Sequence, residues 1–279
     1  MAEPVGLDIV RRALAEDHAA DDVTTRLLGA AGRAPAVMAF IVEERCVVAG
    51  IPVIETVYRE LDPAATVTAK TPEGSWVEAG AVIAQVRGAA SSLVTGERVA
   101  LNFLQRLCGI ATRTRHAADA VTGTPARITH TRKTTPGLRA LEVYAVQTGG
   151  GVLNRLSLAD EVLWKDNHWT LAARNGLSLA DALRAVPPAM NVVVEVETEA
   201  QLAEAIAARV PHLLVDNQPP ERVAEWAARA GGDVTIQASG GITIETARAY
   251  AAAGAHLLAI GALTHSASAV AIRCDIVTA

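Results

Sequence analysis

The chain has 279 residues, a length that suits one large domain or two smaller ones. Apolar residues make up 51% of it and aromatic residues only 3%, so the core must consist mainly of Ala, Val, Leu and Ile, as in helices packed on a parallel sheet. The net charge of −5 argues against a general nucleic-acid binder, and no apolar run reaches membrane length.

The cysteines and the first residues indicate the compartment. Cys46, Cys108 and Cys274 are too scattered for a metal knuckle, and their odd number argues against a disulfide framework. Residues 1–17 are polar and charged, unlike a signal peptide. We therefore expect the protein in a reducing cytoplasm.

The first part of the chain predicts a mixture of helices and short strands. Residues 7–18 have the pattern of an amphipathic helix. Between residues 36 and 86, short β-rich runs are separated by glycines and other turn residues, which is typical of a small β-rich domain. Residues 91–107 again have helical periodicity.

In the second half, short buried strands alternate with amphipathic helices. We predict strands at 126–130, 161–165, 191–197, 212–216, 234–238 and 257–261. We predict helices between them at 179–186, 199–209, 220–230 and 243–254. Such repetition gives a parallel sheet, either a barrel or a doubly wound sheet. Polar or glycine residues end most of these strands, and a barrel would gather those ends in one pocket. We therefore favour a barrel-like α/β fold of about six or seven strands.

The few lysines of this chain point to a site. Only three of the 25 basic residues are lysines, and two of them, Lys133 and Lys165, fall between residues 129 and 168. Lysine is a compact point charge that can grip a phosphate or carboxylate, whereas arginine binds as a planar fork. A chain that takes its surface charge from arginine therefore uses lysine where the chemistry requires it.

Two carboxylates and two glycine-containing loops follow the predicted strands. Glu195 and Asp216 end consecutive strands, where they could cap helices or pair with arginines, or could bind Mg²⁺ or sugar hydroxyls. Ser239-Gly240-Gly241 precedes a helix, and a glycine-rich loop in that position points N–H groups at an anion, typically a phosphate. Gly261-Ala262, at the next strand end, could complete this cradle.

Basic side chains fall in the same stretch of sequence. Arg132 and Lys133 follow one predicted strand, and Arg139, Arg155 and Lys165 lie beyond them. A pocket that combines several cations, two carboxylates and a phosphate cradle fits a phosphorylated sugar with a diphosphate, together with an acidic co-substrate.

These motifs together resemble those of the quinolinate phosphoribosyltransferase family. The resemblance covers essentially the whole chain, and it rests on residues 22–25, 97–98, 101–102, 131–139, 144–146, 149–151, 165–168, 216–217 and 239–241. It implies an N-terminal α/β domain over residues 1–110 and an open, incomplete α/β barrel over 111–267, with residues 268–279 packing back on the first domain. It also implies a homodimer or a multiple of dimers, in which the neighbouring subunit completes each active site.

The reaction that the resemblance implies belongs to NAD biosynthesis. It is the transfer of the phosphoribosyl group of phosphoribosyl pyrophosphate to quinolinate, with Mg²⁺ as cofactor, giving nicotinate mononucleotide, diphosphate and CO₂. Arg132 and Arg155 would hold the pyridine carboxylates, with Arg98 contributed across the dimer interface. Lys133 and Lys165 would contact carboxylate or diphosphate oxygens.

The remaining implied roles concern the sugar. Glu195 and Asp216 would bind the ribose hydroxyls or Mg²⁺. The residues that would cradle the 5′-phosphate are Ser239, Gly240, Gly241 and Gly261.

Several positions depart from the family's pattern. Asn154 stands where the family has the His that helps to hold a substrate carboxylate, His130 where it has Asp, and Val143 where it has Lys. Further departures are Leu153, Ser157, Gln218 and Gln237.

These departures leave alternatives open. They could be tolerated drift, with Asn154 donating a hydrogen bond and His130 restoring a positive charge, or they could adapt the enzyme to a different aromatic acid in a specialised pathway. A non-catalytic sugar-phosphate-binding paralogue is a third possibility. A carbon–carbon lyase with Lys165 as a Schiff-base nucleophile is a fourth, although the cations near Lys165 favour anion binding.

Overall fold

The computed structural model describes residues 5–277, and their contacts divide the chain into two compact units. The first contains residues up to Arg115, Thr134–Gly150 and the chain after Ala262. The second contains His116–Lys133 and Gly151–Ala262. The domain boundary placed after residue 110 stays a prediction. Within residues 5–277, no helix is both long and apolar enough to cross a membrane.

The first unit contains an antiparallel sheet with the strand order β12-β1-β5-β3. Its strands are β1 (Pro35–Val42), β3 (Thr66–Ala69), β5 (Val82–Ala89) and β12 (Ile272–Val277), and two short strands, β2 (Cys46–Val47) and β4 (Trp76–Val77), pair separately. The central strand β1 pairs with β5 on one side and with β12 on the other, so the end of the chain supplies an edge of this sheet.

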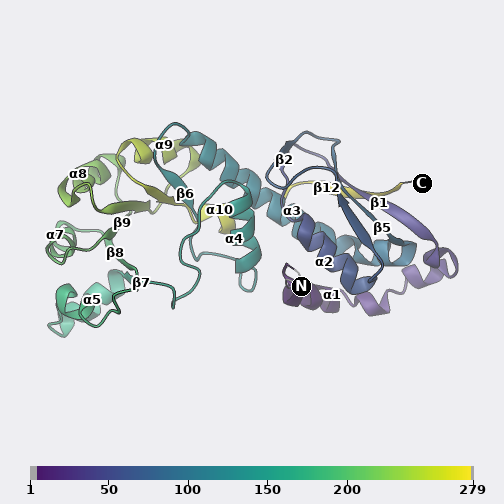
Figure 1. Ribbon diagram of the computed structural model, residues 1–279, viewed down its shortest axis with the longest axis horizontal. Helices are drawn as coiled ribbons and strands as arrows, with labels where there is room; N and C mark the ends of the chain where they lie inside the picture. The colour runs from purple at the N-terminus through teal and green to yellow at the C-terminus, as the bar shows by residue number, and fades with distance from the viewer. Residues whose placement is uncertain (1–4, 278–279) are drawn as a thin grey trace. The chain divides into compact units, whose positions relative to one another are not determined.

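Helices cover one face of this sheet (Figure 1). The helices of the first unit are α1 (Leu7–Glu16), α2 (Ile51–Leu61), α4 (Arg139–Thr148), most of α3 (Ala90–Ala120) and most of α10 (Ala262–His265), with 3₁₀ turns at Ala19–Asp21, Thr25–Leu28 and Ala31–Arg33. Helix α2 begins after Gly50, whose φ of 114° suits glycine, and it has a proline in its first turn. In the core, the ring of Tyr58 on α2 meets that of Phe40 on β1 edge to face, with ring centroids 6.3 Å apart.

The second unit contains a parallel sheet with the strand order β6-β11-β10-β9-β8-β7. Its strands are β6 (Arg127–Thr129), β7 (Val162–Trp164), β8 (Val192–Val196), β9 (His212–Asp216), β10 (Thr235–Ser239) and β11 (Leu257–Ala259). Each lies within two residues of a strand predicted from the sequence. The helices between them, on the outer side of the curved sheet in Figure 1, are α5 (Asp166–Arg174), α6 (Leu179–Leu183), α7 (Glu199–Ala207), α8 (Pro220–Ala230) and α9 (Ile244–Ala252).

The two edge strands leave this sheet open. Strands β6 and β7 stand at opposite ends of the strand order, and no ladder joins them within residues 5–277. Outside β6, Val152 adds one parallel bridge to Thr129, which begins a seventh strand without completing it. The prediction of an open, incomplete α/β barrel is therefore confirmed.

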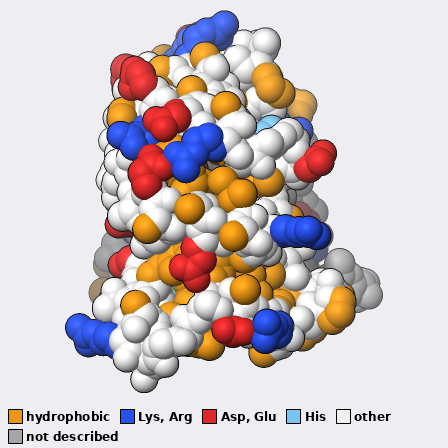
Figure 2. Space-filling model, turned by 90° about the vertical axis from the view of Figure 1, so that its left-hand side faces the viewer, with side chains coloured by type: hydrophobic (Ala, Val, Ile, Leu, Met, Phe, Trp, Pro, Cys, Tyr) orange, Lys and Arg blue, Asp and Glu red, His pale blue; other side chains and the backbone are white. Residues whose placement is uncertain are grey.

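Charges of both signs are interspersed on the outer face of the helices. Figure 2 shows basic and acidic side chains next to one another among apolar ones. On α7 and α8, for example, Glu199 pairs with Arg222 at 2.8 Å and also with Arg229. Exposed pairs of this kind contribute little to stability, typically below about 1 kcal/mol.

Candidate active site

A cavity of about 570 Å³ lies at the carboxyl ends of the parallel strands in the second unit. It is lined by Thr131, Arg132, Lys133, Asn154, Arg155, Glu161, Leu163, Lys165, Asp166, Val193, Glu195, Glu197, Leu214, Asp216, Asn217, Gln237, Ser239 and Ala259. Segments from six successive strand ends thus meet around one space, as the barrel topology requires.

The alternation of side chains along each strand decides which residues reach the cavity. On β8, Val193 and Glu195 line it, whereas Val194 and Val196 are fully buried and do not. On β10, Gln237 and Ser239 line it and Ala238 does not. Successive residues of a strand point to opposite faces, so β7, β8, β9 and β10 each present an apolar or neutral residue deep in the barrel and a polar one at or just after the strand's carboxyl end.

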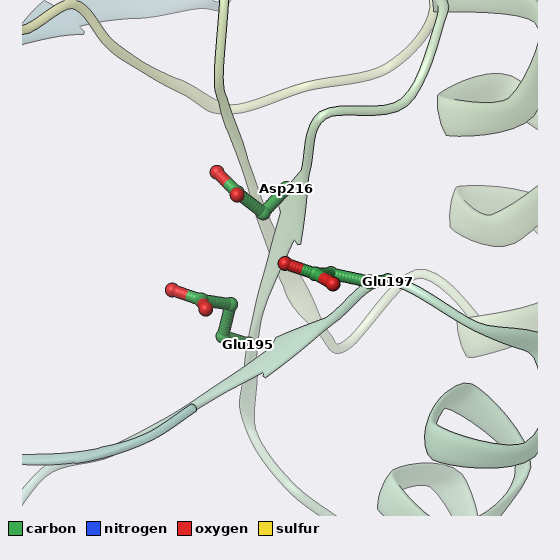
Figure 3. Close-up of side chains that lie close together, drawn as sticks. All are labelled: Glu195, Glu197 and Asp216. Carbon is green, nitrogen blue, oxygen red and sulfur yellow. The ribbon is translucent and has the colours of Figure 1, made fainter. Parts of the chain in front are cut away.

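Three carboxylates gather on one side of the cavity. Oxygen atoms of Glu195, Glu197 and Asp216 lie within 4.8 Å of one another, and Figure 3 shows these side chains at the ends of β8 and β9. Burial, and then the negative charge of Asp216, raise the pKa of Glu195 to about 6. A bound cation would relieve this repulsion, and carboxylate oxygens are the ligands that Mg²⁺ prefers.

Cationic side chains line the other parts of the cavity. Burial lowers the pKa of Arg155, and the positive charge of Arg132 lowers it further. The Nε atom of Arg132 is buried and finds no acceptor within residues 5–277. Lys165 Nζ lies 3.2 Å from Asp166 Oδ1. Two neighbouring guanidiniums, one of them with an unused buried donor, have the chemistry to hold an anion.

The structure places Asn154 at the cavity but His130 behind it. His130 is fully buried and is not a lining residue. Its Nε2 accepts a hydrogen bond from the Asn154 backbone N–H at 3.0 Å, which requires an unprotonated Nε2. His130 therefore supports the cavity wall instead of adding a positive charge to the cavity.

The residues predicted to form the phosphate cradle are only partly in the cavity. Ser239 lines it, whereas Gly240, Gly241, Gly261 and Ala262 do not. Gly240 has a φ of 86° and lies directly beside Asn217, where a Cβ atom would come within 2.2 Å of Asn217 Oδ1. The loop then leads into α9, whose N-cap is Thr243. The two glycines therefore lie at the carboxyl end of β10, before a helix N-terminus.

Two residues noted in the sequence belong to the first unit. Arg98 is exposed on α3. Val143, where the family has lysine, is buried on α4 with 4% of its surface exposed.

Sequence reasoning gave no site role to six polar lining residues: Thr131, Glu161, Asp166, Glu197, Asn217 and Gln237. Glu197 carried a usable signal, because it follows Glu195 by two positions and so lies on the same face of the chain in extended conformation. Asn217 has a left-handed φ of 52°, a conformation that sequence alone does not reveal.

Comparison with known proteins identifies the family over most of the chain. Residues 22–108 match the N-terminal domain and residues 110–275 the C-terminal domain of quinolinate phosphoribosyl transferase. The chain belongs to the quinolinate phosphoribosyltransferase family. It is therefore a phosphoribosyltransferase, as the sequence predicted.

Members of this family from several bacteria are similar over most of their length. A nicotinate-nucleotide pyrophosphorylase [carboxylating] of Mycobacterium leprae is 38% identical over 96% of both chains. A probable enzyme of the same name from Bacillus subtilis is 40% identical over 82% of this chain and 79% of its own. The crystal structure of NadC from Streptococcus pyogenes superposes with a TM-score of 0.90 at 32% identity, covering 100% of this chain and 99% of that one.

Proposed function

We propose that the protein transfers the phosphoribosyl group of phosphoribosyl pyrophosphate to quinolinate and releases diphosphate and CO₂, forming nicotinate mononucleotide. The names of its relatives describe this reaction, in which "carboxylating" refers to the reverse direction. They give no support to the alternatives of a different acceptor, a non-catalytic paralogue or a lyase.

The observation that carries the proposal is the division of charge in the cavity. Arg132, Arg155 and Lys165 supply positive charge, and Glu195 and Asp216 supply negative charge, around one space of about 570 Å³. Quinolinate and diphosphate are both anions, whereas the sugar offers hydroxyls and develops positive charge at C1′. A site for the three together needs both kinds of side chain.

In this proposal the cavity residues stabilise the departure of diphosphate. The bond between C1′ and the diphosphate oxygen breaks and its electron pair leaves with diphosphate, while the pyridine nitrogen donates its lone pair to C1′. Lys133 and Lys165 offset the charge that grows on the leaving oxygens, and Arg132 and Arg155 hold the acceptor carboxylates in line with C1′.

Loss of CO₂ then follows from the new bond. Once the nitrogen is quaternary, the carboxylate on the adjacent carbon can leave as CO₂, and its electron pair remains on that carbon next to the positive nitrogen. This carbon then takes a proton from water in place of the lost carboxylate. The role of the protein is to hold the other carboxylate while this happens.

We propose Mg²⁺ as the cofactor. The donor set fits, because Glu195, Glu197 and Asp216 offer hard oxygen atoms close together, and Mg²⁺ in such sites takes one or two carboxylates along with substrate phosphates. When bound, the ion would neutralise charge on the diphosphate. We extend the prediction of Glu195 and Asp216 as ligands to include Glu197.

The assembly and compartment also remain proposals. We infer a homodimer in which Arg98, an exposed cation on α3, is contributed to the neighbouring subunit's site. We infer a cytoplasmic location, which is supported by free thiols at Cys46, Cys108 and Cys274.

An acceptor panel tests the reaction. Purified protein with Mg²⁺ and phosphoribosyl pyrophosphate is given quinolinate, nicotinate or benzoate, and diphosphate and CO₂ are measured separately. Of the three acids, we expect only quinolinate to give diphosphate and CO₂, and to give them in equal amounts. Diphosphate release with another acid but not with quinolinate would contradict the proposed acceptor, and release with none would contradict the reaction. Size-exclusion chromatography with light scattering tests the dimer.

A further inference from the structure

The segment that carries Arg155 is attached to the edge of β6. The backbone N–H of Val152 donates to the carbonyl of Ile128 at 2.8 Å, and the hydroxyl of Thr129 donates to the carbonyl of Val152 at 2.9 Å. The two segments run parallel, but a single bridge between Thr129 and Val152 is the extent of their regular β-pairing.

The side chain of His130 continues this attachment by one more step. In place of a backbone carbonyl, its imidazole Nε2 accepts the N–H of Asn154 at 3.0 Å. The ring is fully buried, so no water competes for this donor. Without the imidazole acceptor, this N–H would lose its partner at the point where the chain turns into the cavity.

The amide of Asn154 completes a clamp around the same peptide. Its Nδ2 donates to the His130 carbonyl at 3.2 Å, and its Oδ1 accepts from the Arg155 backbone N–H at 2.9 Å. Its acceptor oxygen and one of its two N–H groups are therefore already used within the protein. The side chains of His130 and Asn154 therefore form hydrogen bonds mainly with backbone groups, which leaves little of their hydrogen-bonding capacity for a ligand.

The clamp matters because the next residue, Arg155, lies close to a second cation, Arg132, in the cavity. Arg155 carries one of the two mutually repelling guanidiniums of the cavity, and within residues 5–277 its side chain makes one hydrogen bond, a long contact of 3.5 Å from Nη1 to the Glu161 carbonyl. Its own side-chain contacts therefore constrain it weakly, and the fixed backbone limits where the guanidinium can go.

We propose that His130 is a positioning residue for acceptor binding: with Asn154 it forms a neutral clamp that fixes the backbone of Arg155 and so directs this guanidinium toward a carboxylate of the acceptor. The inference rests on the proposed function, because it takes the acceptor to be an aromatic acid. It assigns the His130 and Asn154 departures one joint role, since each side chain bonds the backbone of the other residue.

The test compares His130→Leu, which removes the acceptor atom, with His130→Gln, whose amide can still reach the Asn154 N–H. We expect His130→Leu to raise KM for quinolinate about tenfold, the effect of one lost hydrogen bond, and to change KM for phosphoribosyl pyrophosphate less than about twofold. His130→Gln should recover most of the loss. Thr124→Val is the control, since it removes a hydroxyl bond to the Val121 carbonyl in the same unit, at a residue that does not line the cavity, and it should leave KM for quinolinate near the wild-type value.

A double-mutant cycle distinguishes an effect of His130 on the orientation of the Arg155 guanidinium from a general effect on folding. In an Arg155→Met background no guanidinium remains to be directed, so His130→Leu should add little further loss. If His130→Leu does not fold, His130→Asn replaces it, because its shorter amide ends near the position of Nδ1 and not of Nε2. Equal increases in both KM values, failure of His130→Gln to recover activity, or an undiminished effect in the Arg155→Met background would each overturn the clamp.

The wild-type protein distinguishes this inference from the proposed function. Absence of quinolinate turnover by wild type contradicts the proposed function, and with it the clamp as a device for this acceptor. Normal wild-type turnover with an unchanged KM in His130→Leu overturns the clamp alone.

Discussion

Glu195, the last residue but one of β8, and Asp216, the last residue of β9, lie on neighbouring parallel strands, and their carboxylates converge on the same side of the cavity (Figure 3). The arrangement costs stability, because burial and then the charge of Asp216 raise the pKa of Glu195 to about 6. Such a cost is typical of a site that is preorganised for a cation or for sugar hydroxyls.

We predict that Glu195→Gln stabilises the protein at neutral pH while it inactivates the enzyme. Because the folded-state pKa of Glu195 is raised from 4.5 to about 6, its favourable contribution is complete below pH 4.5 and is lost as the pH rises through 6. Since the side chain is partly exposed, we discount the full shift to about 1 kcal/mol. Urea unfolding at pH 4.5 and pH 7.5, in buffer with EDTA, should show a gain only at the higher pH.

The matched control for this prediction is Glu197→Gln. Glu197 belongs to the same group of carboxylates but is exposed on the chain after β8. It should give a smaller stability change between the two pH values. A gain from Glu195→Gln that is equal at both pH values would show that its cause is packing and not ionisation.

The sequence predicted the second unit better than the first. Its strands are short runs of buried β-branched residues between amphipathic helices, so their existence and their positions along the chain could be inferred. Helix α2, in contrast, was not predicted. Its sequence, IPVIETVYREL, is rich in β-branched residues that favour strands locally, and it is helical because its apolar face packs in the core.

In the candidate site, too, some residues could be predicted from the sequence and others could not. Lys165, Glu195 and Asp216 could be predicted together because each ends or follows a strand, and topology brings strand ends into one place. The role of His130 could not, since it depends on a contact with a residue 24 positions away. A resemblance to a family marks such a position as unusual, but only coordinates show which atom its imidazole meets.

Lys165 provides a second prediction. Its ammonium lines the cavity and pairs with Asp166, and we propose that it contacts the leaving diphosphate. Lys165→Met should lower kcat/KM by about 100-fold, the usual loss when a charged group that stabilises a transition state is removed. Steady-state kinetics with Lys70→Met, which changes an exposed lysine of the first unit, supply the control. A covalent adduct of Lys165, trapped by borohydride with a carbonyl substrate, would instead support the lyase alternative.

The loop after β10 allows a comparison between adjacent glycines. A Cβ on Gly240 would come within 2.2 Å of Asn217 Oδ1 and 2.7 Å of its backbone nitrogen, whereas a Cβ on Gly241 meets nothing within 4 Å. Both have positive φ, so each alanine carries a backbone strain of about 1 kcal/mol, but only Gly240→Ala must also displace Asn217 beside Asp216.

We therefore expect Gly240→Ala to weaken binding of ribose 5-phosphate at least about tenfold, and Gly241→Ala to weaken it only a few-fold. Titration calorimetry with ribose 5-phosphate measures both. Similar losses from the two variants would mean that φ alone, and not the close approach to Asn217, makes glycine necessary here.

A buried ion pair in the first unit gives the last prediction. Glu142 is fully buried on α4 and accepts hydrogen bonds from Arg106 Nη2 at 2.8 Å and from both the backbone and the hydroxyl of Thr135. Arg106 also donates to the carbonyls of Thr264 and Ala267, so one guanidinium joins α3 to α4 and to the segment that contains α10.

Removing the carboxylate should destabilise this unit strongly. Glu142→Ala leaves the Arg106 charge and the Thr135 donors without their acceptor, and breaking a buried pair in this way costs about 3–5 kcal/mol. Glu55→Ala removes an exposed partner of Arg59 on α2 and should cost less than about 0.5 kcal/mol. Differential scanning calorimetry should show the transition of the first unit at a lower temperature in Glu142→Ala. A loss no greater than that of Glu55→Ala would mean that the carbonyls of Thr264 and Ala267 suffice to hold the guanidinium.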